Sequence, residues 1–147
     1  MDRGELQRIF ERLDNALSSD AVLHIRGGAA VLALGLDLRV TLDIDVLPGS
    51  RFVDAETLVL PRSSDEVPYN TVFRGRRLTV KTPPASDLVI GKLKRLEPED
   101  LADVAFLIRR FGLTRADLEE SAGRLPARFL KDPVVQDNLR YILEDYL

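Results

Sequence analysis

Two aspartates stand one residue apart inside an apolar run, in the stretch TLDIDVL at residues 41–47. On a strand, Asp43 and Asp45 would project from the same face, about 7 Å apart, where their negative charges repel each other. A divalent cation held between them offsets this repulsion, because carboxylate oxygens are the ligands that magnesium prefers. A strand of this kind therefore predicts phosphoryl or nucleotidyl transfer, in which metal ions align the attacking and leaving oxygens.

A pair of glycines, Gly27 and Gly28, precedes this strand and follows a short apolar run. A turn without side chains lets the backbone approach phosphate groups closely, and the start of the helix that follows favours an anion. The ordinary alternative is a plain turn together with an edge strand whose charges prevent aggregation. We expect Leu42, Ile44 and Val46 to be buried, and this favours a joint site over the ordinary alternative.

The composition limits the classes of site and of partner. The chain has 147 residues, of which 45% are hydrophobic and 31% are charged, as in an ordinary globular domain. It has no cysteine and one histidine, so a bound metal would be held by oxygen, as magnesium, manganese and calcium are. The net charge of -3 argues against a general nucleic-acid coat. Without an apolar leader or a membrane span in the sequence, we expect a cytoplasmic protein.

Apolar periodicity and turn residues predict the elements that position these residues. In the first part of the chain they are a helix over 5–17, a strand over 21–25, a short helix that ends at Gly35, a strand over 41–47, a strand over 56–60 and a hairpin over 71–83 with its turn at 74–76. Further helices are expected to begin at Ser86, Pro98, Thr114 and Asp132-Pro133, the first running to about Leu96 and the second ending at Gly112. This order predicts an α+β fold: a small mixed β-sheet with helices on one face and a C-terminal helical part.

The stretch GGAAVLALGLDLRVTLDIDVL, residues 27–47, resembles the nucleotidyltransferase superfamily of the DNA polymerase β type. The signature of that superfamily is a Gly-Gly or Gly-Ser turn followed by two aspartates one residue apart on a strand. The likeness is closest to small bacterial nucleotidyltransferases of the abortive-infection, AbiEii-like kind. Downstream, SDLVIGKLKRLEPEDLADVAFL at residues 86–107 is similar to a helical segment of that group, with Asp87, Lys92, Asp100 and Asp103 at the matching positions. The resemblance covers about 20–112, so we expect one domain over 1–147 with its core there and a helical extension at about 113–147.

This resemblance implies a nucleoside triphosphate substrate and a Mg²⁺ or Mn²⁺ cofactor. By this resemblance, Gly27 and Gly28 would cradle the triphosphate, and Asp43 and Asp45 would bind the metal and take part in catalysis. Lys92 would contact a phosphate, and Arg39 would contact the phosphates or the acids. The expected reaction transfers NMP from the triphosphate to a hydroxyl of RNA or protein. Relatives of this kind often belong to toxin–antitoxin or phage-defence systems.

The sequence departs from the family pattern at the third carboxylate, which active members commonly present on a later strand. The strand in RRLTVKTP carries Thr79 and Lys81 there, and Asp87 or Asp100 would have to substitute. Without a general base, nucleotide binding can survive while chemistry slows by about a hundredfold to ten-thousandfold. The alternative function is therefore a catalytically silent module of the same fold that binds a protein partner, for example a cognate toxin or antitoxin.

Several of these residues also have plain structural interpretations. Lys92 would be a solvent-facing helix lysine, and Asp100 and Asp103 would be first-turn acids favoured by the helix dipole, with Asp103 available to pair with Lys92 or Arg39. His24, in an apolar strand, is interpreted as a core residue rather than a catalyst. Arg26, immediately before the glycines, would contact phosphate or stay at the surface.

The basic cluster of Arg74, Arg76 and Arg77 at the hairpin tip is most simply a solvated turn. A nucleic-acid-binding domain that uses these arginines is a third, weaker interpretation.

Overall fold

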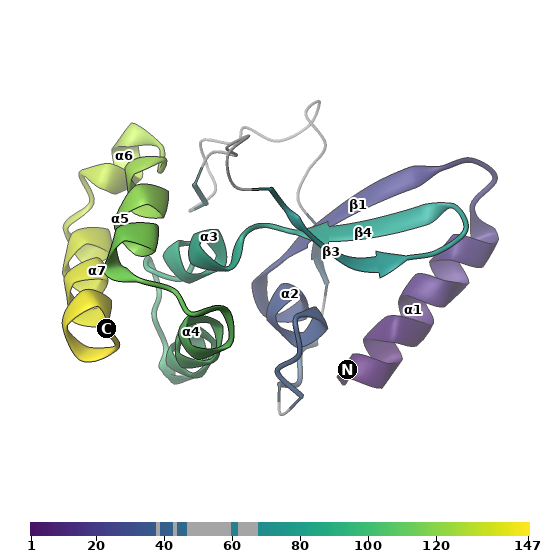
Figure 1. The fold of residues 1–147 in the computed structure, drawn as a ribbon, viewed down its shortest axis with the longest axis horizontal. Coiled ribbons are helices and arrows are strands. Elements are labelled where there is room, and N and C mark those ends of the chain that lie inside the picture. The colour runs from purple at the N-terminus through teal and green to yellow at the C-terminus, as the bar shows by residue number, and fades with distance from the viewer. Residues whose placement is uncertain (38, 43, 47–59, 62–67) are drawn as a thin grey trace. The chain divides into compact units, whose positions relative to one another are not determined.

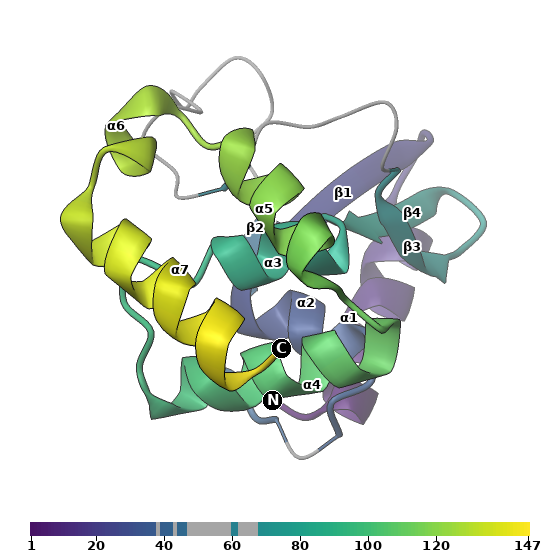
Figure 2. The same ribbon diagram turned by 60° about the vertical axis from the view of Figure 1, so that its left-hand side comes forward.

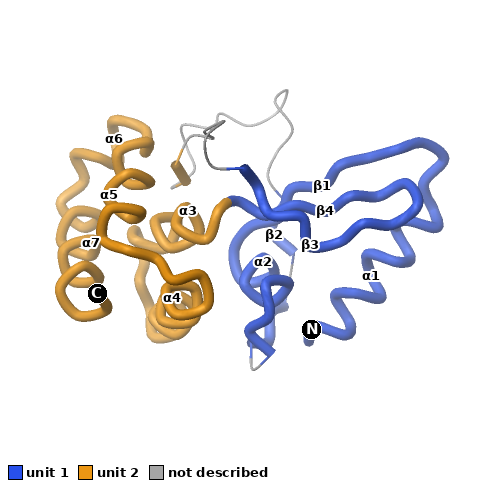
Figure 3. The backbone as a smooth tube through the Cα atoms, in the orientation of Figure 1, with its two compact units in different colours: residues 1–52, 68–83 blue, residues 53–67, 84–147 orange. Residues whose placement is uncertain are grey.

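The computed structural model describes residues 1–37, 39–42, 44–46, 60–61 and 68–147 (Figure 1). Asp43 lies outside these residues, as does most of the strand predicted over 56–60. The chain divides into two compact units, coloured separately in Figure 3. The first comprises residues 1–52 and 68–83, and the second comprises residues 53–67 and 84–147. The boundary at Pro83–Pro84 falls inside the core that was expected over about 20–112.

Four strands in the described part of the first unit form a mixed sheet, which confirms the α+β class. They are β1 (Ala21–Arg26), β2 (Asp45–Val46), β3 (Asn70–Arg74) and β4 (Leu78–Thr82), in the spatial order β2-β1-β4-β3. β1 runs parallel to β4 and antiparallel to β2. β3 and β4 form the antiparallel hairpin that the sequence predicted.

Two helices of this unit, α1 (Arg3–Ala16) and α2 (Gly27–Ala33), lie on the same face of the sheet (Figures 1 and 2). Their buried side chains meet those of the central strands, where Ile25 and Val80 have no exposed surface. The rings of Phe10 on α1 and Phe73 on β3 are 5.6 Å apart. Removal of these apolar side chains from water holds the two helices against the sheet.

The strand predicted over 41–47 is much shorter, because only Asp45–Val46 is paired with β1 in the described residues. The expected burial of its apolar residues was also wrong, since Leu42 is 98% exposed and Val46 is 48% exposed. In the sheet formed by the described residues, β2 is the last strand on its side, and β1 is its one strand neighbour there.

The second unit is helical in its described residues. Its elements are α3 (Ala85–Ile90), α4 (Pro98–Phe111), α5 (Arg115–Gly123), α6 (Ala127–Leu130) and α7 (Pro133–Asp145). The predicted boundaries of α4, α5 and α7 are confirmed by local capping. Gly112 takes the left-handed conformation that ends α4, Thr114 and Asp117 form a capping box, and the Asp132 carboxylate accepts from the backbone N–H of Val134.

The first helix of this unit differs from its prediction. α3 begins after Pro84, places Ser86 inside the helix and ends at Ile90, well before Leu96. Lys92 and Leu93 then donate to carbonyls three residues back, so the chain tightens into turns. None of the helices that the structure describes has the length and apolar character that a membrane crossing requires.

A single carboxylate organises the turn between β3 and β4. Asp14 of α1 accepts hydrogen bonds from the backbone N–H groups of Arg76, Arg77 and Leu78, at 2.9, 2.7 and 2.7 Å. A Cβ placed on Gly75 would lie 2.4 Å from Asp14 Cγ, so the glycine lets the carboxylate approach the turn. These three donors, Arg77 first, hold the pKa of Asp14 below its ordinary value of 3.8. The basic tip is thus tied to α1 through its backbone.

We expect Asp14→Asn to lower the melting temperature near neutral pH, because a neutral amide oxygen is a weaker acceptor and leaves fewer of the three N–H groups bound. Since the native pKa is lowered, the stabilisation is complete above about pH 4 and is lost as the pH falls through the native pKa. Thermal unfolding by circular dichroism from pH 7 to pH 2 measures this. The difference from wild type should shrink on acidification, and a difference that persists to the lowest pH would contradict it. Glu11→Gln, an exposed change on the same helix, is the control.

Candidate functional site

The glycine pair lies where β1 turns directly into α2. Gly27 has φ +65°, in the left-handed region that residues with a Cβ rarely adopt. A Cβ at Gly27 would lie 2.4 Å from Asp45 Oδ2, and one at Gly28 would lie 2.7 Å from Arg39 Nη2. The spaces left by the two missing side chains are therefore occupied by a carboxylate and by a guanidinium.

Two sets of backbone contacts place the segment that carries Asp45. β2 pairs antiparallel with the end of β1, so that Arg26 is opposite Asp45 and Ile25 is opposite Val46. Farther back, the Thr41 carbonyl accepts from the amino group of Met1 at 2.9 Å, and the Thr41 N–H donates to the Met1 carbonyl at 3.2 Å. The structure thus brings four predicted site residues together: Gly27, Gly28, Arg39 and Asp45.

Arginine side chains supply positive charge at this bend. Within the described residues, Arg26 Nε is buried and has no hydrogen-bond partner. Arg39 lies against Gly28, with Nε 3.1 Å from the position that a Cβ would take. A guanidinium presents several N–H donors in a planar fork that matches phosphate oxygens, so this end of the sheet can bind an anion.

The sheet face opposite α1 and α2 carries further polar groups. Side chains alternate along a strand, so His24 and Arg26 point away from the face that buries Ile25. His24 is opposite Lys81 in the parallel register, and its ring meets Tyr69 edge to face at 5.2 Å. Burial, and then the charge of Lys81, lower the pKa of His24, so its imidazole is neutral at pH 7. The interpretation of His24 as a core residue was wrong, and its alternation with Ile25 was the signal that could have corrected it.

Lys92 lies in the second unit, in a buried ion cluster. Its Nζ is 3.1 Å from Asp100 Oδ1 and 2.7 Å from Asp103 Oδ2, and its side chain is 9% exposed. The pairing of Lys92 with Asp103 is confirmed. Arg95 also binds Asp100 through Nε at 2.9 Å and Nη2 at 3.0 Å. Burial opposes ionisation of Asp100, but Arg95 and Lys92 outweigh it and lower its pKa to about 2. The ammonium of Lys92 is neutralised by the chain's own carboxylates, and its contact with phosphate stays a prediction.

Asp87 is also engaged within the second unit. It is 1% exposed and accepts from Ser121 Oγ at 2.8 Å and from Arg124 Nη1 at 3.1 Å and Nη2 at 2.5 Å. These bonds join α3 to α5. The two carboxylates considered as substitutes for a third catalytic acid, Asp87 and Asp100, are therefore both held by basic side chains of their own unit.

In the part of the chain that the structure describes, one aspartate, Asp45, is the candidate metal ligand at the glycine bend. Asp45 is exposed beside Gly27, whereas Asp43, its predicted partner, lies outside the described residues. Among the described residues no three acidic or histidine side chains gather as a metal site. No family model, curated protein or solved structure matches the chain. The candidate site thus depends on the geometry at Gly27 and Gly28 and on the resemblance of the sequence.

Alanine substitutions at three glycines measure how strongly the backbone at the glycine bend requires a residue without a Cβ. Gly27→Ala combines an unfavourable backbone conformation with a clash against Asp45, so we expect a loss of more than about 2 kcal/mol in the free energy of unfolding. Gly112 has φ +60° and open space around the position of a Cβ, so Gly112→Ala should lose about 1–2 kcal/mol in the free energy of unfolding. Gly123→Ala meets neither obstacle and should be neutral or slightly stabilising. Urea denaturation compares the three, and a Gly27→Ala variant as stable as wild type would contradict the left-handed backbone at Gly27.

The cluster around Lys92 leads to a second stability prediction. Lys92→Met removes the ammonium from between two buried carboxylates, and we expect a loss of about 3–5 kcal/mol in the free energy of unfolding. Lys131→Met, an exposed lysine of the same unit, should change it by less than about 0.5 kcal/mol. Urea denaturation at neutral pH is the measurement. If the two variants are equally stable, the cluster does not hold the second unit together.

Proposed function

We propose that the glycine bend of the first unit binds the triphosphate of a nucleotide with Mg²⁺ or Mn²⁺, and that the protein transfers NMP to a hydroxyl of RNA or protein. One observation carries the proposal: the Asp45 carboxylate and the Arg39 guanidinium fill the two spaces beside Gly27 and Gly28. A phosphate chain that carries a cation needs both charges, acidic oxygen for the cation and N–H donors for the phosphates.

The phosphates would be held mainly by the arginines. Arg26 Nε, buried and without a hydrogen-bond partner among the described residues, has a donor still to satisfy. Arg39 lies beside the same turn. The Arg39 guanidinium fills the space that a side chain at Gly28 would take, so phosphate oxygens would meet its N–H donors there.

The donor chemistry of the bend fits a magnesium ion. Magnesium is usually held by one or two carboxylates, with waters and substrate phosphates completing its shell. Asp45 supplies one exposed carboxylate, and Asp43 is predicted to supply the other. When bound, the cation neutralises charge on the phosphates and aligns the reacting oxygens.

In the proposed reaction, the acceptor hydroxyl oxygen forms a bond to the α-phosphorus while the bond from that phosphorus to the bridging oxygen breaks. Pyrophosphate leaves, and the hydroxyl proton passes to a base. His24 is neutral at pH 7 and lies on the polar sheet face beside Lys81, so its imidazole can accept a proton. We assign it as the candidate base in place of the third carboxylate.

A second candidate function is the catalytically silent module that binds a protein partner, such as a cognate toxin or antitoxin. The observation that favours it is the chemistry of β4, where Thr79 and Lys81 stand on the polar face and no acid does. The ammonium group of Lys81 attracts an anion, but an ammonium group cannot take a proton from a hydroxyl.

Isothermal titration with each nucleoside triphosphate and Mg²⁺ tests the binding site. We expect Asp45→Asn, Asp43→Asn and Arg39→Ala each to weaken binding by about tenfold or more, because each removes a ligand of the metal or of the phosphates. Asp20→Asn changes an exposed aspartate of the same unit and should leave binding unchanged. If wild type binds no nucleotide, or if Asp45→Asn binds as well as wild type, the assigned site is wrong.

Transfer of label from α-³²P nucleotides to RNA or protein separates the two candidates. An enzyme transfers label in wild type and loses the transfer in Asp45→Asn and in His24→Gln. A silent module binds the nucleotide and labels nothing.

A further inference from the structure

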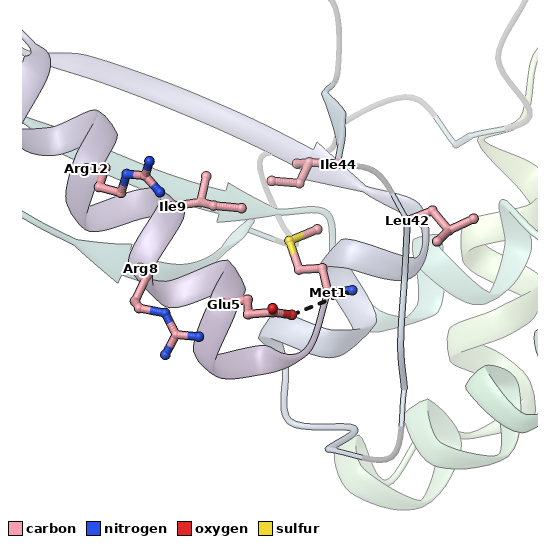
Figure 4. A pocket seen from close by; sticks show the side chains of 7 residues that line it. All are labelled: Met1, Glu5, Arg8, Ile9, Arg12, Leu42 and Ile44. Atoms are coloured by element: carbon pink, nitrogen blue, oxygen red, sulfur yellow. Dashed lines mark ion pairs between the residues drawn. The ribbon is translucent and has the colours of Figure 1, made fainter.

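A groove in the first unit lies between α1 and the segment that leads into β2. It has a volume of about 620 Å³, within the range of pockets that bind ligands. Its apolar wall consists of Met1, Ile9, Leu42 and Ile44. Figure 4 shows Met1, Ile9 and Ile44 turned toward one another, with Leu42 at the far end of the groove. We call this feature the α1 groove.

The polar lining of the α1 groove carries an excess of positive charge. Arg8 and Arg12 are exposed and stand one turn apart on α1, and neither makes an ion pair or a hydrogen bond with the described residues. Glu5, in contrast, is already engaged: it accepts from the backbone N–H of Asp2 at 2.8 Å and lies 3.7 Å from the amino group of Met1. Like charges at this helical spacing repel each other, so an acidic occupant would relieve the repulsion.

We propose that the α1 groove docks a peptide segment of a partner protein in which bulky apolar residues are interspersed with carboxylates. The apolar side chains would pack on Ile9 and Ile44, removing apolar surface from water. The carboxylates would pair with Arg8 and Arg12, whose guanidinium groups bind carboxylates in a bidentate manner. Charge complementarity thus selects an acidic partner, and the apolar wall requires that the acid be next to a hydrophobic residue.

The place of the groove beside β2 favours a peptide over other anionic amphipathic molecules. Among the described strands β2 ends the sheet order on this side, and a strand in that position can accept a further strand through its backbone. Alternate side chains of an added strand point to one face. An apolar residue and a carboxylate two positions apart on such a strand would therefore both face the helix side of the sheet, where Ile9 and the two arginines of α1 lie.

This docking surface is independent of the proposed nucleotide site. Ile44 contributes to the groove, whereas Asp45, the next residue, lies against Gly27. Loss of nucleotide binding in Asp45→Asn therefore does not test peptide binding in the groove. Loss of peptide binding likewise does not test nucleotide binding at the bend. The contact is smaller than a standard protein interface, so a dissociation constant in the micromolar range is expected.

Selection from a displayed library of random decapeptides against the whole protein tests the proposal. Peptides that bind wild type but not an Arg8→Glu, Arg12→Glu double variant should be enriched in carboxylates interspersed with leucine, isoleucine, valine or phenylalanine. Enrichment of basic peptides, or no enrichment after this counter-selection, overturns the proposal.

Fluorescence anisotropy of an enriched, fluorescein-labelled peptide then assigns the contacts. We expect the double charge reversal to weaken binding by about tenfold or more, and Arg8→Lys with Arg12→Lys to retain most of it. The matched control reverses two exposed arginines of α4, Arg109→Glu with Arg110→Glu, and should leave the affinity unchanged. Equal losses in the control and in the α1 variant would overturn the assignment.

Two further measurements exclude other occupants. Sedimentation velocity reports whether the groove is covered by a second copy of the chain. Flotation with phosphatidylglycerol vesicles reports whether it binds an anionic membrane. A dimer that the α1 charge reversal dissociates, or vesicle binding that the same reversal removes, would overturn the peptide proposal. A monomer that does not bind the vesicles and does bind the acidic peptides supports the peptide proposal.

Discussion

The bare backbone of Gly27 and Gly28 is the constraint on which the geometry of the first unit depends. Because neither residue has a Cβ, β1 can turn into α2 without a connecting loop, and Asp45 and Arg39 can lie directly against the turn. The register that sets Arg26 opposite Asp45 brings a second guanidinium to the same place. A carboxylate and two arginines therefore gather around the turn, an arrangement suited to an anion that carries a cation.

The buried charged side chains of the second unit have a different role, because they pair with one another. Lys92 lies between Asp100 and Asp103, and Arg124 holds Asp87. Pairs as buried as these are costly to break, since removal of one partner leaves an uncompensated charge in a poorly solvated place. The downstream part of the family-like sequence thus has a structural explanation in this chain, whether or not nucleotide is bound.

The segment from residue 42 to residue 46 serves two surfaces of the first unit. Ile44 lines the α1 groove, and Asp45 reaches the glycine bend. Adjacent residues of an extended chain point in opposite directions, so one short segment can contribute to a polar site and to an apolar groove. If both proposals hold, a partner on the groove would contact the same segment that carries the metal ligand.

By itself, the sequence determined the features that depend on neighbours a few residues away. The caps of α4, α5 and α7, the hairpin and the turn from β1 into α2 all follow from such local contacts. The packing of distant segments decided that Asp14 holds a turn 62 residues away and that Leu42 is exposed. These outcomes depend on strand order and on which helix covers which face, and no local pattern of residues encodes either.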